Sequence, residues 1–163
     1  MKRIALGLVL ALGFAPLVQA RDRLGVWNDW GAFRDAAVPR CYAIAMAVEQ
    51  PGRHRETQPY FTISNWPRRN IRGAIHARLS REMAPGKPVV FLVGGQRFGA
   101  LGNGVDVWAA DRGGDAAIVA ALRGNGDVTV VAHGRDGRLV RDTYRLAGAA
   151  SAMDAASLGC AAS

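Results

Sequence analysis

Beyond residue 20 the sequence has no apolar run that could span a membrane, which takes about 20 apolar residues. The one long apolar stretch, from Ile4 to Phe14, is shorter, and it follows two basic residues. Val18 and Ala20 then occupy the positions that signal peptidase reads as small residues. We expect residues 1–20 to be a signal peptide that is cleaved after Ala20. The mature chain would be exported without a transmembrane span, and it would be periplasmic or secreted.

Cysteine is scarce, since the chain contains only Cys41 and Cys160. Two cysteines in an exported chain more often form a disulfide than remain thiols. Such a disulfide would remove denatured-state entropy worth roughly 4–5 kcal/mol, provided that the two Cα atoms lie within about 6 Å. Buried unpaired thiols are one alternative. A catalytic thiol is another, but it would need a partner base, and no histidine stands in such a context.

Metal, nucleotide and hydrolase motifs are also lacking. The three histidines, His54, His76 and His133, have no spacing to cysteines or carboxylates that is typical of a metal site. The stretch "GGQRFGALGNG" (94–104) lacks GxxxxGK[ST] and a following helix, so it predicts a hairpin with tight turns. No GxSxG serine and no recognised nucleic-acid motif occurs. We therefore expect no metal, no cofactor and no nucleic-acid partner.

Lysine is nearly absent, whereas arginine is concentrated. Of the 21 basic residues only Lys2 and Lys87 are lysines. Residues 53–82 contain seven arginines against two glutamates, a net charge of +5. A basic face on an exported protein favours acidic envelope partners such as lipopolysaccharide, anionic lipid or acidic polysaccharide, and a solvated arginine-rich surface is the plainer interpretation.

Short segments rich in Val, Ile, Phe and Tyr, separated by Gly, Pro, Asn and Asp, predict β-strands. After a Trp-containing first strand and a turn at Pro39, the expected strands cover 41–48, 59–65, 72–80, 88–94, 96–101, 104–109, 127–133 and 138–146. Ile75, Ala77 and Leu79 would share one face, as would Val140, Tyr144 and Leu146. Asp136-Gly137 would form the last hairpin turn.

Two segments predict helices, 115–124 and 146–159, and Asp115 is the expected N-cap of the first. The mature chain, residues 21–163, has the size of one domain. We expect a mainly β, two-sheet antiparallel β-sandwich, immunoglobulin-like or jelly-roll-like, with two short helices.

Aromatic side chains leave two interpretations open. Trp27, Trp30, Tyr60 and Phe61 are more typical of core anchors than of a ligand platform. The stretch "NWPRRN" (65–70) is different, because Pro67 would turn the chain and expose its neighbours together. The candidate binding residues are Trp66, Arg68, Arg69 and Arg72. Asp106, Asp111 and Asp115 are candidates for a substrate or cation site, although Asp115 is accounted for as a cap and Asp111 by a turn.

Three parts of the chain carry a family resemblance: "NDWGAF" followed by "RCYAIA", "GKPVVFLVGGQRF", and "AAIVAALRGNGDVTVVAHGRDGRLVRDTYRLAGAASAMDAA". In these motifs and their order the chain resembles the invasion-associated locus B family of exported bacterial proteins. The resemblance covers Trp30 to Ala156 and indicates a divergent member, without the cysteine pair that the family commonly carries before its first helix. It implies a β-sandwich-like exported protein with no established enzymatic chemistry and no family site residue to carry over.

Together these observations predict an exported, non-catalytic envelope protein with a binding or structural role. Its arginine-rich face would contact acidic envelope or host-surface components, or it would bind another envelope protein. The alternative is a small periplasmic hydrolase or thiol enzyme that uses Cys41 or the Asp106–Asp115 region.

Overall fold

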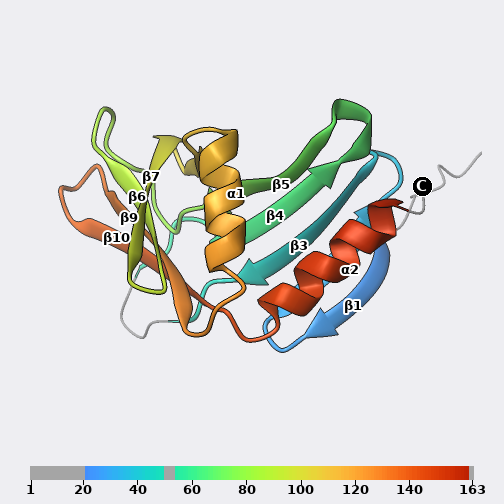
Figure 1. Ribbon diagram of the computed structural model, residues 1–163. Helices are drawn as coiled ribbons and strands as arrows, with labels where there is room; N and C mark the ends of the chain where they lie inside the picture. Colours follow the sequence, from blue (N-terminus) through green and yellow to red (C-terminus); the bar gives the residue numbers. More distant parts are fainter. Residues whose placement is uncertain (1–20, 50–53, 162–163) are drawn as a thin grey trace, which may run out of the picture.

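A computed structural model describes residues 21–49 and 54–161, in which strands dominate (Figure 1). The predicted signal peptide and Arg53 lie outside the described residues. The strands are β1 (Asp22–Trp27), β2 (Trp30–Asp35), β3 (Arg40–Met46), β4 (Tyr60–Trp66), β5 (Ile71–Arg78), β6 (Val89–Val93), β7 (Gln96–Asn103), β8 (Asp106–Ala109), β9 (Asp127–His133) and β10 (Leu139–Arg145). The helices are η1 (Pro67–Arg69), α1 (Arg112–Ala121) and α2 (Ala149–Ala161).

The strands follow the predicted alternation of apolar and polar residues. Ile75 and Ala77 on β5, and Leu79 just after it, are buried at 1%, 0% and 0% exposure, so the predicted inward face is confirmed. In the β9–β10 hairpin the turn falls at Asp136-Gly137, where Gly137 has φ +77°. Glycine adopts this left-handed conformation without the clash that a Cβ would cause.

One prediction at the start of the fold is wrong. Instead of a single Trp-containing strand, β1 and β2 form a hairpin, because the chain reverses at Asn28, whose φ is +50°. Asparagine tolerates this conformation better than most residues. The turn at Pro39 lies where it was expected, between β2 and β3.

The strands form a sandwich-like, antiparallel architecture, as predicted. The two layers of this sandwich belong to one continuous sheet. Its order is β1-β2-β3-β4-β5-β8-β7-β6-β9-β10, and it is not closed into a barrel. The layers join where β5 pairs with β8 through three residue pairs, so backbone hydrogen bonding continues from one layer into the other. The hairpins β6–β7 and β7–β8 account for the glycine-rich segment, which confirms the prediction of tight turns there.

Aromatic side chains fill the space between the layers. Phe61 lies at the centre, with ring centroids 5.6 Å from Phe91 and 5.6 Å from Tyr144. The Trp30 ring lies 6.2 Å from Phe61, and its Nε1 donates to the Arg145 carbonyl at 2.7 Å. Trp30 and Phe61 are fully buried, so both are core anchors.

Helix α1 follows β8, and its N-cap is Asp111, whose Oδ1 accepts from Gly114 N at 2.7 Å. The prediction of Asp115 as the cap is therefore wrong. Asp115 lies one turn further on, where its carboxylate accepts from Ile75 N at 2.8 Å. The sequence "DRGGD" offers two aspartates, and the earlier one has the extended backbone that a cap requires.

Helix α2 lies across β1 to β4 and is joined covalently to β3. The sulfur atoms of Cys41 and Cys160 are 2.02 Å apart and their Cα atoms 5.7 Å apart, so the predicted disulfide is confirmed. Among the described residues, neither helix has the length and apolar character that a membrane crossing demands.

Candidate functional site

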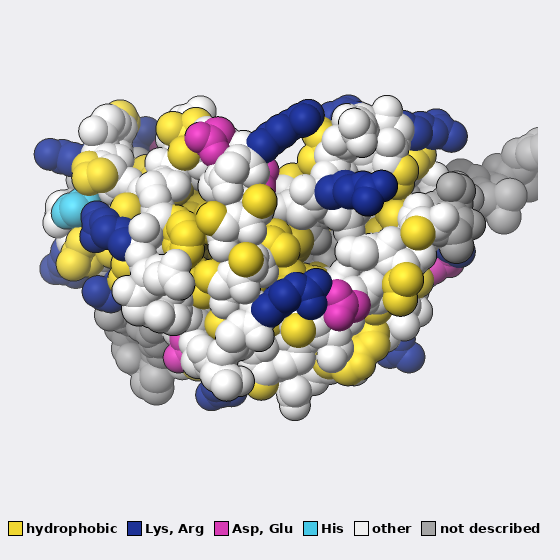
Figure 2. All heavy atoms as spheres, in the orientation of Figure 1, with side chains coloured by type: hydrophobic (Ala, Val, Ile, Leu, Met, Phe, Trp, Pro, Cys, Tyr) yellow, Lys and Arg dark blue, Asp and Glu magenta, His cyan; other side chains and the backbone are white. Residues whose placement is uncertain are grey.

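A groove lies between α1 and α2, with strands β4 and β5 beneath it. It has a volume of about 610 Å³, within the range of small-molecule sites. Figure 2 shows hydrophobic side chains in the hollow between the two helices and basic side chains around it. The apolar lining includes Ile63, Ile71, Val119 and Met153.

The groove exists because each helix packs on a different part of the sheet. Helix α1 contacts β5, β8 and β7, whereas α2 contacts β1, β2, β3 and β4. The strip of sheet between them is left partly uncovered, with Ile63 on β4 and Ile71 at the start of β5. Gly73 permits α1 to lie close, since a Cβ at this position would meet Val119 Cγ2 at 3.2 Å.

The β4–β5 turn forms one end of the groove. Pro67 to Arg69 make a single 3₁₀ turn, and Asn70 follows with φ +50°. Asn65 Oδ1 accepts from Gly73 N at 2.9 Å and holds the two strands together behind the turn. Arg72, one of the predicted binding residues, lines the groove and is exposed.

The remaining predicted residues surround the same turn. Arg68 and Arg69 are exposed, and Trp66 is half-buried. The Arg69 guanidinium carbon lies 5.1 Å from the Trp66 ring centroid, and that of Arg40 lies 5.2 Å away. The structure therefore places Arg69 beside Trp66 and adds Arg40, which the sequence did not single out, whereas Arg72 is the predicted residue that lines the groove.

The Arg123–Asp154 ion pair bridges the two helices beside the groove. Arg123 follows α1 and Asp154 lies on α2, with Nη2 2.6 Å from Oδ1. The hydrogen bond from Arg123 lowers the pKa of the Asp154 carboxyl. Arg123 is therefore a second cation at the groove, although Asp154 partly neutralises its charge.

The arginines of residues 53–82 do not form one continuous face. Arg68, Arg69 and Arg72 are near the β4–β5 turn, whereas Arg78 is at the other end of β5, about 20 Å along the strand. Arg81 follows β5 and pairs with Asp136 at 2.8 Å. The candidate basic surface is therefore limited to Arg68, Arg69 and Arg72, at the β4–β5 turn and the end of the groove.

The residues proposed for an enzyme do not converge. Cys41 is fully buried in the disulfide, and the described chain has no free cysteine. Asp111 caps α1 and Asp115 binds the backbone of β5, where burial raises the pKa of its carboxyl. Asp106 instead contacts His76, with Oδ1 2.9 Å from Nε2. Among residues 21–49 and 54–161, no three His, Cys, Asp or Glu side chains form a group that could hold a metal ion.

The fold and the groove define a class: a mainly β, disulfide-linked protein with an apolar groove and basic residues at its end. Comparison with protein-family models, with curated proteins and with solved structures gives no match. The resemblance to the invasion-associated locus B family stays a prediction.

Proposed function

We propose that this protein is an exported, non-catalytic envelope protein that binds an acidic amphiphile, such as an anionic lipid or the lipid part of lipopolysaccharide. An acyl chain would lie in the groove between α1 and α2, and the acidic head group would meet the arginines at the β4–β5 turn. The observation that carries this proposal is that the apolar groove ends at Arg72, and that Arg68 and Arg69 belong to the 3₁₀ turn just before it.

The apolar lining favours an acyl-bearing ligand over an acidic polysaccharide, because sugar hydroxyls would find few partners along Ile63, Ile71 and Val119. Burial of six methylene groups is worth about 5 kcal/mol, at about 0.8 kcal/mol each. That energy alone corresponds to a dissociation constant of about 0.3 mM. Micromolar affinity therefore requires the contribution of the charged head group.

Arginine suits this head group because its planar guanidinium pairs with phosphate or carboxylate through two parallel hydrogen bonds. The positive net charge of the chain, +8 in total and +6 after loss of residues 1–20, would also attract anionic surfaces. This long-range attraction is screened over about 8 Å at physiological ionic strength. Binding should therefore weaken as salt is added.

The direct test compares two ligands with the same acyl chain, lysophosphatidylglycerol and lysophosphatidylcholine, below their critical micelle concentrations. We expect the anionic ligand to bind at least ten times more tightly in equilibrium dialysis. Arg72→Glu should remove most of this preference, whereas Arg141→Glu, at an exposed arginine outside the groove, should not. Equal affinity for both ligands would contradict the head-group assignment.

A second pair of variants tests the groove itself. Ala116 lines the groove on α1, and Ala117 is an exposed neighbour on α1 outside the lining. Ala116→Trp should block the acyl chain and weaken binding of both ligands, and Ala117→Trp should leave it unchanged. If both variants bind like wild type, the groove is not the site.

Charge reversal at the turn provides a test on membranes. Arg68→Glu combined with Arg69→Glu should lower retention on phosphatidylglycerol vesicles and flatten its dependence on salt. Unchanged retention would remove these two arginines from the proposal. The enzyme alternative has less support, because the disulfide occupies Cys41 and the Asp106–Asp115 residues serve separate contacts.

A further inference from the structure

The face of the sheet opposite the groove carries two adjacent rows of side chains. The pairing of β3, β4, β5, β8 and β7 places one residue of each strand in each row, since side chains alternate between faces. The first row consists of Ile44, Thr62, His76, Trp108 and Leu101. The second consists of Met46, Tyr60, Arg78, Asp106 and Asn103.

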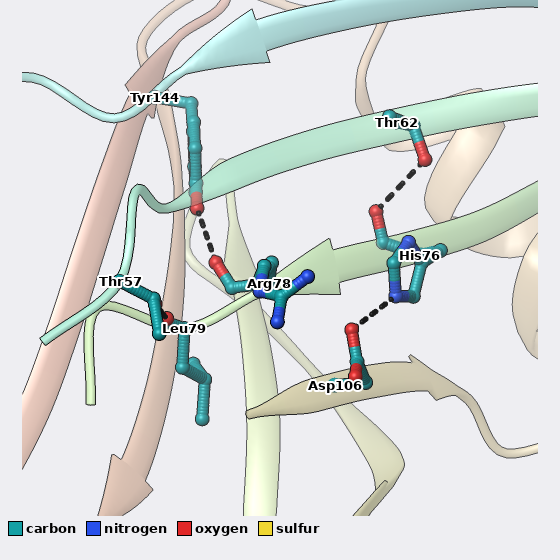
Figure 3. Close-up of polar contacts among 7 residues, drawn as sticks. All are labelled: Thr57, Thr62, His76, Arg78, Leu79, Asp106 and Tyr144. Carbon is teal, nitrogen blue, oxygen red and sulfur yellow. Dashed lines mark hydrogen bonds and ion pairs between the residues drawn. The ribbon is translucent and has the colours of Figure 1, made fainter. Parts of the chain in front are cut away.

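The centre of these rows combines an exposed Trp108 with partly exposed neighbours, His76 and Asp106, that are held in place. Trp108 is 43% exposed, an unusual position for an indole on a sheet. The His76 ring lies between two aromatic rings, with centroids 5.4 Å from Trp108 and 5.6 Å from Tyr60. Asp106 fixes the His76 ring through Nε2, and Thr62 Oγ1 donates to the His76 carbonyl at 3.2 Å (Figure 3).

We propose that this surface is a binding platform for a glycan chain that lies across the strands. The C–H face of a pyranose ring would stack on Trp108, as apolar surface does on an indole. Its hydroxyls would donate to Asp106 and accept from Arg78 in the neighbouring row. The Tyr60 and Trp108 ring centroids lie 5.6 and 5.4 Å from that of His76, so the two rings are at most about 11 Å apart. That separation suits two rings of one sugar chain with one between them.

The charged residues of the second row, Arg78 and Asp106, favour a sugar over other ligands. Arg78 and Asp106 stand directly opposite each other on β5 and β8, and they place a donor and an acceptor next to the exposed indole. A purely apolar partner would bury both groups without new hydrogen bonds, which is costly. A sugar ring has an apolar face and hydroxyls at its edge, so it complements both rows together. Asp106 is held before binding by its contact with His76.

This site is independent of the amphiphile groove, which lies on the other face of the sheet. The binding experiment uses the oxidised protein and three probes: the hexamer of β-1,4-linked N-acetylglucosamine, cellohexaose, and purified peptidoglycan sacculi. Calorimetric titration serves for the two hexamers and co-sedimentation for the sacculi. The three probes distinguish an acetamido sugar, a plain glucan and a cross-linked wall as sources of the same ring chemistry.

We expect at least one probe to bind, and Trp108→Ala and Asp106→Ala each to weaken that binding at least ten-fold. Leu158→Ala removes a large exposed side chain on α2, 72% exposed, and should have no effect. Arg72→Glu, in the groove, should also leave glycan binding unchanged. Glycan binding can therefore be judged even if the amphiphile proposal fails. Circular dichroism and thermal melting check that each variant is folded.

Two outcomes would overturn the proposal. One is that no probe binds the wild-type protein, and the other is that Trp108→Ala binds as well as Leu158→Ala. In the first case, a dimer in analytical ultracentrifugation that Trp108→Ala dissociates would show that the face joins two copies of the chain.

Discussion

Arg123 and Asp154 join the two helices through a contact of 2.6 Å between Nη2 and Oδ1, at the side of the groove. Both side chains are about half exposed, at 48% and 56%. Exposed ion pairs contribute at most about 1 kcal/mol, so this pair adds little to the stability of the fold.

The first prediction concerns the pH dependence of this pair. The unfolded carboxyl has a pKa of about 3.9, and the hydrogen bond from Arg123 lowers the pKa of Asp154 in the folded protein. A lowered folded-state pKa means that the stabilisation is present above about pH 4 and is lost as the pH falls through the folded pKa. Asp154→Asn should therefore reduce the free energy of unfolding by less than about 1 kcal/mol at pH 7.

Urea denaturation of wild type and Asp154→Asn at pH 7 and at about pH 2.5 measures this difference. The gap between the two proteins should close at the lower pH. Arg123→Met combined with Asp154→Asn completes a double-mutant cycle, and a coupling energy of zero at pH 7 would contradict the prediction.

The second prediction concerns the disulfide. Cys41 and Cys160 are separated by 119 residues, so its loss should cost about 4–5 kcal/mol in the chain-entropy model. The Cys41→Ala, Cys160→Ala variant should match the reduced wild type in urea. A thiol reagent under denaturing conditions should detect no thiol before reduction and two afterwards. Two thiols before reduction would show that the bond does not form.

The third prediction compares a buried and an exposed tryptophan. Trp30→Phe leaves the Arg145 carbonyl without its partner, and it should lower the free energy of unfolding by about 1–3 kcal/mol. Trp108→Phe, on the exposed face, should change it by less than about 0.5 kcal/mol. Chemical denaturation measures both, and equal losses would mean that the Trp30 hydrogen bond contributes little.

The fourth prediction compares two glycines with positive φ. At Gly148, with φ +90°, a Cβ would lie 2.0 Å from the Trp27 carbonyl oxygen. At Gly137, with φ +77°, nothing lies within 4 Å. Gly137→Ala should cost about 1–2 kcal/mol from backbone strain alone. Gly148→Ala has the same backbone strain and must also displace the β1–β2 turn, so it should lower the free energy of unfolding by about 2–5 kcal/mol. Thermal denaturation ranks the two, and a smaller loss at Gly148 would contradict the steric argument.

Local patterns were sufficient to predict most strands and turns. Alternation identified the inward face of β5, and Asp136-Gly137 identified the last hairpin, because both depend on neighbouring residues. The β1–β2 turn was missed, although Asn28 and Asp29 between two tryptophans are typical turn residues. The cap of α1 was misplaced because Asp111 and Asp115, which flank Arg112 and two glycines, both fit the pattern of a cap before a helix.

Long-range features could not be predicted from the sequence. His76 and Asp106 are 30 residues apart, and only the register of β5 against β8 brings them together. The groove likewise depends on where α1 and α2 pack, so Val119 and Met153 gave no signal as lining residues. Arg72 could be selected from local charge density, but the same criterion also selected Arg78 and Arg81, which lie at the far end of β5.

The disulfide also determines what a protease can release from this protein. Cys41 lies in β3 and Cys160 near the end of α2, so the chain between them forms a covalent ring that contains eight of the ten strands and both α-helices. A single cut in a turn such as Gly94-Gly95 or Asp136-Gly137 opens the ring but leaves both pieces attached to each other. Such a nicked protein would migrate as one species until it is reduced. Among the described strands, β1 and β2 precede the ring, so one cut between Asp35 and Cys41 could release this hairpin as a fragment with no covalent link to the rest.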